Sequence, residues 1–257
     1  MKNLYFLTLL IVSIIFISCS ENKSKYPLEK PYWTPSDYNS VINTIKYLDN
    51  PEEGFPTLDN PETRLIVEKL TDENNYLVVV NDNELGLKHK NEVASDFFEK
   101  YRNMSSIYYV RDRKDNFIYE KEMLSVYSYG LGLQLQYFKI GNEEIAQDSD
   151  DPNSDQVKDV INNNVLTLIN NYNNFIDLMN DEKSFSEEGL IKYSEIIDKH
   201  FLTLVNTYPE ANYYNLKNKI DLIEKKVLSS KVNQSLKNLQ KLINEKELEK
   251  ELEKEIS

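Results

Sequence analysis

The C-terminal half of the chain repeats one pattern, apolar residues three or four positions apart, over four consecutive segments between residues 156 and 243. An α-helix brings residues at this spacing onto one face, so each segment predicts a helix with one buried side. The stripes comprise Val157, Val160, Ile161, Val165, Leu168, Tyr172, Phe175, Ile176 and Met179; Leu190, Ser194, Ile197, Phe201, Leu204 and Tyr208; Leu216, Ile220, Ile223 and Val227; and Val232, Leu236, Leu239, Leu242 and Ile243. Short connections between such helices favour antiparallel neighbours. The pattern therefore predicts a C-terminal helical bundle over residues 156–257.

The end of this bundle differs from the rest in its charge. Between Glu245 and Glu255 almost every residue is Glu or Lys, and Leu248, Leu252 and Ile256 stand four apart. Oppositely charged residues four apart support a solvated helix, whereas fewer than two clean heptads are present for a coiled coil. We therefore expect a charged helical tail.

The N-terminal half, residues 32–146, begins with the residue types of a helix start. Thr34 can cap the helix, Pro35 suits its first position, and Asp37 lies in its first turn. Trp33, the only tryptophan, comes just before the cap. A buried anchor is the favoured role for Trp33, and an exposed ring that stacks on a ligand is the alternative.

Other parts of this half have strand character. The segments 76–80 and 107–110 are rich in β-branched and aromatic residues, which favours short strands. The segment 127–137 alternates apolar and small or polar residues, as a strand does, but strong helix formers lead into it. We predict a helix from about residue 117, capped by Asp115, to Gly141, which is a typical helix stop. The fold class expected is mainly α, an antiparallel helical bundle or array, with two or three short strands allowed in residues 32–146.

An acidic segment, residues 147–155, separates the two halves. It contains Asp148, Asp150, Asp151 and Asp155, whose hard oxygen ligands would suit a cation. Their spacing matches no known loop geometry, which favours a solvated loop between subdomains. A second acidic stretch resembles a calcium loop at 81–92, but Leu85 stands where an oxygen ligand is needed. With only two histidines, far apart in sequence, we expect no metal and no cofactor.

The N-terminus has the pattern of an export signal. An apolar run of 14 residues, Leu4 to Ile17, follows Lys2 and precedes Ser18 and the only cysteine, Cys19. The run is short for a transmembrane helix, which needs about 20 apolar residues. A charged start, a short apolar core and a small residue before a cut site are typical of a secretory signal peptide.

The segment Phe16-Ile17-Ser18-Cys19 resembles the lipobox of bacterial lipoproteins, except that Phe16 stands where leucine is usual. The resemblance implies that residues 1–18 are a signal peptide cut after Ser18 and that the Cys19 thiol carries a diacylglyceryl group. Residues 19–31 would then be a lipidated flexible tether. Ser20, in place of aspartate, implies sorting to the outer membrane in a bacterium with two membranes. The lipid on Cys19 would be the contact with the membrane.

The charge of the chain limits its partners. The formal net charge is −13 at pH 7. Nucleic-acid binding needs clustered Lys and Arg to contact phosphates, so we expect no nucleic-acid partner. Anionic headgroups would repel an acidic body, so lipid rather than charge must hold the chain to a membrane.

Three hypotheses about function remain open. The first is a membrane-anchored cell-envelope lipoprotein with a protein-interaction or assembly role. The second is a lipoprotein that binds a carbohydrate or small ligand through Trp33 and the tyrosines between Tyr101 and Tyr137. The third is a hydrolase with a serine or paired-carboxylate site, which leaves no fixed spacing in a sequence. Cys19 is the one site residue assigned, and no catalytic residue is assigned.

Overall fold

A computed structural model describes residues 25–48, 55–109 and 118–256 of the chain, and within these ranges it contains helices and turns but no strand. Contacts divide the chain into two units, residues 1–31 and 32–257. Of the first unit only residues 25–31 are described. They form turns, one of them closed by the Leu28 N–H, which donates to the Tyr26 carbonyl at 2.8 Å.

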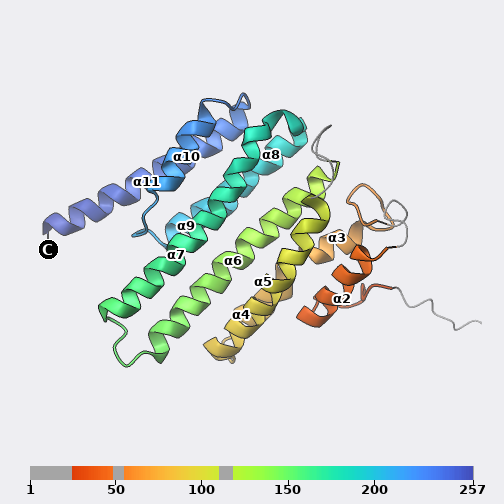
Figure 1. Ribbon diagram of the computed structural model, residues 1–257, viewed down its shortest axis with the longest axis horizontal. Helices are drawn as coiled ribbons and strands as arrows, with labels where there is room; N and C mark the ends of the chain where they lie inside the picture. The colour runs from red at the N-terminus through yellow and green to blue at the C-terminus, as the bar shows by residue number, and fades with distance from the viewer. Residues whose placement is uncertain (1–24, 49–54, 110–117, 257) are drawn as a thin grey trace, which may run out of the picture. The chain divides into compact units, whose positions relative to one another are not determined.

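The second unit is mainly helical (Figure 1). In chain order its elements are α2 (Pro35–Lys46), α3 (Arg64–Leu70), α4 (Asn74–Val80), α5 (Leu87–Tyr109), α6 (Glu120–Asp148), α7 (Asp155–Ile176), a 3-10 segment (Asp177–Ser184), α8 (Glu187–Ile196), a π-helical segment (Ile197–Phe201), α9 (Leu202–Thr207), α10 (Tyr214–Glu224) and α11 (Ser230–Ile256). The prediction of a mainly α protein is therefore confirmed.

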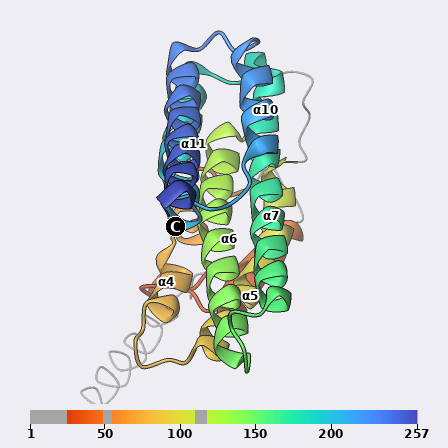
Figure 2. The same cartoon turned by 90° about the vertical axis from the view of Figure 1, so that its left-hand side faces the viewer.

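Helix α6 lies at the centre of this arrangement. It packs on α5 and α7 and also contacts α8 and the π-helical segment. The long helices α5, α6 and α7 run side by side in alternating directions (Figures 1 and 2). The buried residues of α6 come from nearly all round the helix: Glu122, Met123, Leu124, Val126, Tyr129, Gly130, Leu131, Leu133, Gln134, Leu135, Ile140 and Asn142. A helix buried on several sides needs no single apolar stripe.

This central position explains the strand-like alternation at 127–137. Successive apolar residues of α6 face different neighbouring helices, so alternation here does not mark the two faces of a strand. The favoured prediction of a helix is confirmed. Gly141, however, is not a helix stop, since α6 continues to Asp148. The cap predicted at Asp115 lies outside the described residues.

The two other predicted strands are wrong. Residues 76–80 lie in α4, where Tyr76 and Val80, four apart, are buried and the helix packs on α5. Residues 107–109 form the end of α5, and Val110 lies outside the described residues. A strand needs a partner to pair its backbone groups, and tertiary packing overrides the modest β-propensity of such short segments.

The start of α2 has the predicted chemistry. Thr34 and Asp37 form a reciprocal capping box, and Pro35 occupies the first turn. Helices α7 and α8 are capped by Ser154 and Ser186, whose hydroxyls accept backbone N–H groups of the first turn. Residues 149–154 form the turn that joins α6 to α7, so the acidic segment connects two helices that pack on each other.

The π-helical segment Ile197–Phe201 interrupts the regular α-helix between α8 and α9. The buried residues here recur at intervals of four: Ile196, His200 and Leu204, and beside them Ile197, Phe201 and Val205. A regular helix has about 3.6 residues per turn, so a period of four drifts around it. The wider π turn keeps these side chains on one buried face.

Helix α11 forms the charged tail, as predicted, and continues to Ile256. It packs on α8, α9 and α10. Lys217 on α10 pairs with Glu247 at 2.6 Å, and Lys250 pairs with Glu210 at 3.2 Å. Leu248 and Leu252 are 57% and 51% exposed. The ion pairs, rather than apolar burial, fasten this last part of α11 alongside residues 210–217.

Candidate functional site

Cys19, the one site residue assigned from the sequence, lies outside the described residues. Its lipidation therefore stays a prediction. Among the helices of the described ranges, none combines the length and apolar character needed to span a membrane.

The structure brings together a polar cluster that the sequence did not reveal, the residues Glu73, Ser128, Lys199 and His200, here called the polar seam. They come from the start of α4, from α6 and from the π-helical segment. The Ser128 hydroxyl lies 2.9 Å from Nε2 of His200, and Lys199 Nζ lies 2.7 Å from Oε1 of Glu73. The same Glu73 oxygen is 3.9 Å from Nε2 of His200.

The imidazole in the seam is uncharged at neutral pH. His200 is only 4% exposed. Burial is the main cause that lowers the pKa of His200 from 6.5 to about 3, and the charges of Lys199 and Lys192 contribute in the same direction. At pH 7 the contact with Glu73 is thus not an ion pair, and Nε2 can accept the hydrogen bond that the Ser128 hydroxyl donates.

A serine, a histidine and a glutamate in contact suggest a catalytic triad, but their geometry differs from one. In a triad the acid holds one ring nitrogen while the serine uses the other, whereas Glu73 and Ser128 both approach Nε2 of His200. A base that acts near neutral pH also needs a pKa near neutral. The seam instead joins α4, α6 and the π-helical segment through a part-buried hydrogen bond and an exposed ion pair.

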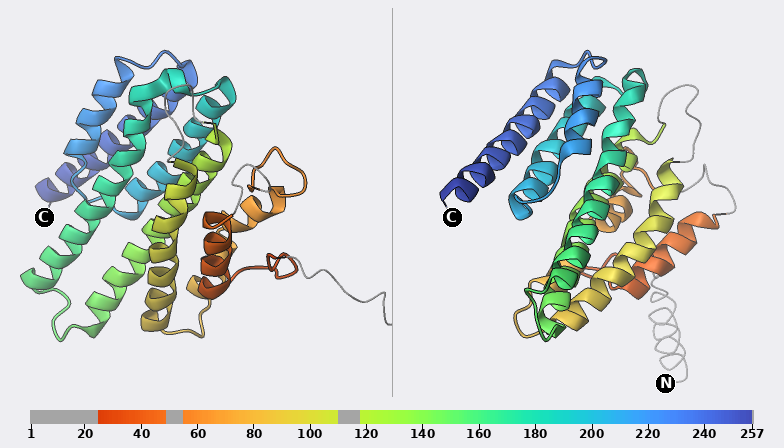
Figure 3. Two further views of the ribbon diagram at one scale, coloured as in Figure 1. Left: turned by 45° about the vertical axis from the view of Figure 1, so that its right-hand side comes forward. Right: turned by 60° about the vertical axis from the view of Figure 1, so that its left-hand side comes forward.

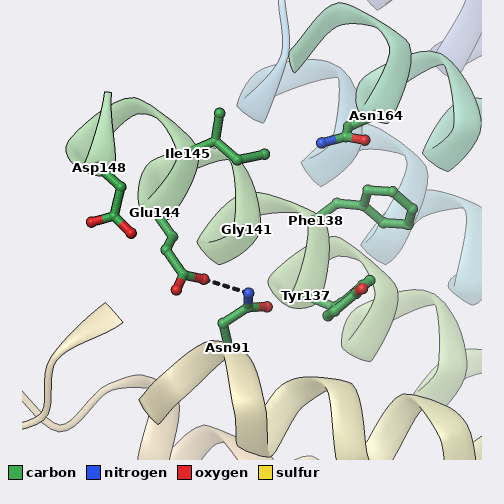
Figure 4. A pocket seen from close by; sticks show the side chains of 8 residues that line it. All are labelled: Asn91, Tyr137, Phe138, Gly141, Glu144, Ile145, Asp148 and Asn164. Carbon is green, nitrogen blue, oxygen red and sulfur yellow. Dashed lines mark hydrogen bonds between the residues drawn. The ribbon is translucent and has the colours of Figure 1, made fainter. Parts of the chain in front are cut away.

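The second candidate is an open groove of about 340 Å³ beside Gly141, here called the Gly141 groove (Figure 4). It is lined by Asn91, Tyr137, Phe138, Gly141, Glu144, Ile145, Asp148 and Asn164. Most of these residues lie on α6, while Asn91 comes from α5 and Asn164 from α7. Figure 4 shows the Glu144 side chain reaching from α6 to Asn91.

Two further cavities have other linings. One, about 330 Å³, lies between α6 and α8 and is lined by charges of both signs, including Arg64, Lys121 and Glu188. The other, about 510 Å³, lies between α7 and the 207–212 turn and has a more apolar lining, including Val165 and Leu166. The Gly141 groove has two carboxylates and two aromatic rings in its lining, whereas the cavity beside α7 has one of each, Glu210 and Tyr208.

The aromatic residues proposed for ligand stacking are mostly buried. Trp33 is 0% exposed, as favoured from the sequence, and its backbone N–H donates to Oδ1 of Asn75 at 2.8 Å. Tyr101, Tyr108 and Tyr129 are buried as well. Tyr137 is half-buried and lines the Gly141 groove. An open platform of coplanar rings built on Trp33 is thus excluded.

The acidic segment has local hydrogen bonds of its own. Oδ1 of Asp151 accepts the Asn153 N–H at 3.1 Å, and the Ser149 hydroxyl accepts the Asp151 N–H at 3.2 Å. Across the part of the chain that the structure describes, no three or more His, Cys, Asp or Glu side chains are grouped as metal ligands. The side chains of Ser149 and Asp151 therefore close turns between α6 and α7.

Within the described ranges, fold and site together define an all-helical protein whose Gly141 groove is lined by two carboxylates and two aromatic rings. Comparison with protein-family models, with curated proteins and with solved structures gives no match.

Proposed function

We propose that this protein is a lipid-anchored component of the bacterial cell envelope whose helical body binds another envelope component. The observation that carries the proposal is the segment Phe16-Ile17-Ser18-Cys19, in which the only cysteine follows a short apolar run and one small residue. A lipid on Cys19 would anchor the chain at its mature N-terminus. Because one acyl chain binds a membrane only marginally, the two chains of a diacylglyceryl group suit this role.

The helical body supports a binding role more than a catalytic one. The seam that most resembles a catalytic site has both polar partners on one nitrogen of His200. The surface charge is strongly acidic, so contacts with a partner would be steered by complementary positive charge. The proposed role is therefore assembly or interaction at the membrane, with Ser20 favouring the outer membrane by resemblance to lipoprotein sorting.

The anchor can be tested by labelling cells that express the full chain with an alkyne analogue of palmitate. The wild-type chain should take up label and fractionate with the outer membrane. Cys19→Ala should lose the label and leave an uncleaved or soluble form. Ser20→Asp is a matched control that should keep the label and move the protein to the inner-membrane fraction. Labelling of Cys19→Ala at the wild-type level would overturn the anchor.

The interaction role needs a separate test. Crosslinking in the native envelope, followed by identification of what is retained, should recover one envelope protein complex in repeated experiments. The Cys19→Ala chain, mislocalised, should recover less of it. Retention of glycan with no protein partner would contradict the interaction role while leaving the anchor intact.

A further inference from the structure

The Gly141 groove is a consequence of the sequence of α6. Tyr137, Gly141, Glu144 and Asp148 are spaced four, three and four apart, which places them on one face of the helix. Gly141 has no side chain, and a β-carbon built there would meet only Oδ1 of Asn91, at 3.8 Å. The glycine thus opens the floor of the groove between polar and aromatic walls (Figure 4).

The carboxylates and one amide oxygen leave hydrogen-bond acceptors free in the groove. The Asn91 amide group donates to Glu144, and the Asn164 amide group donates to Oδ1 of Asn142 at 2.9 Å. Oδ1 of Asn91 is buried and has no hydrogen-bond partner among the described residues. A buried acceptor without a partner is costly, so a ligand that donates hydrogen bonds would be favoured here.

The charge in the groove has one sign. Glu144 and Asp148 are carboxylates, and the lining contains no lysine or arginine. Among the described residues, neither carboxylate has an ion-pair partner. A cation entering the groove would therefore meet negative charge that the surrounding described helices do not neutralise.

The aromatic lining suits the same ligand. The rings of Tyr137 and Phe138 lie edge to face with centroids 5.3 Å apart, and Tyr137 also stacks on Phe98 at 5.3 Å. The negative face of such rings attracts ammonium groups. The cavity volume of about 340 Å³ lies at the small end of ligand pockets.

We propose that the Gly141 groove binds an ammonium group, carried by a small aliphatic amine or by a lysine side chain of a partner. The ammonium donates to Glu144 and to Oδ1 of Asn91, Asp148 adds long-range attraction, and the alkyl chain lies along Tyr137 and Ile145. Binding by the donor-rich cation satisfies the acceptor of Asn91 that the protein itself leaves unpaired.

Calorimetry on the purified full-length chain in detergent tests the proposal with 1,4-diaminobutane as the probe. Saturable binding is expected, and 1,4-butanediol, of similar length but uncharged, should not bind. Glu144→Gln should weaken binding roughly tenfold, because the carboxylate is the main acceptor. Glu143→Gln is the matched control. It removes the same charge from the neighbouring, exposed position of α6, where Glu143 pairs with Lys139 and does not line the groove, and it should leave binding unchanged.

Gly141→Ala separates loss of the groove from loss of folding. The added methyl group meets no atom closer than 3.8 Å, so the variant should fold and yet bind the diamine more weakly. Comparison with N-acetyl-lysine amide distinguishes the sources of the ammonium group. Tighter binding of the diamine supports a free amine, and tighter binding of the lysine derivative supports a partner's lysine. Binding of neither, or equal loss in Glu143→Gln and Glu144→Gln, would overturn the proposal.

Discussion

The phenol ring of Tyr101 on α5 lies against the α-carbon of Gly130 on α6, in the space that a β-carbon would occupy. The close approach lets α5 and α6 form the most extensive helix contact of the described residues (Figure 3). Tyr101 is buried in this contact. The glycine is therefore required by packing, because a helix interior otherwise favours alanine.

Gly130→Ala should destabilise the protein by about 1–3 kcal/mol, since an extra methyl group overpacks a buried contact. Denaturant unfolding measures the change. Gly141→Ala, in the same helix but beside open space, is the matched control, and it should stabilise by about 0.5–1 kcal/mol. Equal effects of the two substitutions would show that helix propensity, and not the ring of Tyr101, decides the outcome.

Stability should fall in acid because of His200. Its pKa is 6.5 when unfolded and about 3 when folded, so the unfolded chain binds the additional proton between these values and stability rises with pH there. The uncharged imidazole makes its full contribution to stability above about pH 6.5, and this contribution is lost progressively toward pH 3. By pH 4 the loss in the free energy of unfolding amounts to about 3 kcal/mol.

The comparison that isolates this effect uses His200→Gln, whose side chain does not titrate. Unfolding of both chains is measured from pH 7 to pH 4, so that the carboxylates contribute equally to each. The wild-type chain should lose more stability over this range than the variant. Parallel curves would mean that His200 titrates normally in the folded protein.

Asn75 should hold the segment before α2 in place. Its Oδ1 accepts the backbone N–H of Trp33 at 2.8 Å, and its Nδ2 donates to the Lys69 carbonyl at 2.7 Å. Asn75→Ala removes both hydrogen bonds, at about 1–3 kcal/mol each. The single tryptophan reports the change, and its fluorescence should shift to the red at lower denaturant. Asn74→Ala, at an exposed neighbouring position, should leave the transition where it is.

Ser186 should matter to both α6 and α8. Its hydroxyl accepts the Gly189 N–H at 3.0 Å as a helix cap and donates to Oε1 of Glu120 at 2.6 Å. Ser186→Ala removes both contacts and should cost about 1–2 kcal/mol in thermal or denaturant unfolding. Ser186→Thr keeps a capping hydroxyl and should retain most of the stability. A similar loss in both variants would point to steric effects at Gly189 instead.

Local sequence signals predicted the parts of the fold that depend on local chemistry. The cap at Thr34 and the helices of the C-terminal half follow from residue types and spacing. The errors fall where packing decides. Residues 78–80 are β-branched valines, but the described residues offer them no partner strand. Gly141 opens a groove instead of ending a helix.

The candidate sites were harder to predict because they join residues that are distant in sequence. Glu73 and Lys199 are 126 positions apart, and the Gly141 groove combines side chains of three helices. Of the groove residues, Tyr137 belonged to the tyrosines considered for binding. The period of four around His200 was a readable signal for the π turn, although it identified no partner of the imidazole.

The π turn at Ile197–Phe201 corresponds to a one-residue insertion in an otherwise regular α-helix. Deleting a residue there could restore unbroken α-helical hydrogen bonding. The same deletion would rotate everything that follows by about 100° and carry Leu204 and Val205 off the buried face. In this helix, any insertion or deletion of one residue also rotates α9 about its axis. The length of the π turn and the orientation of α9 can therefore change only together.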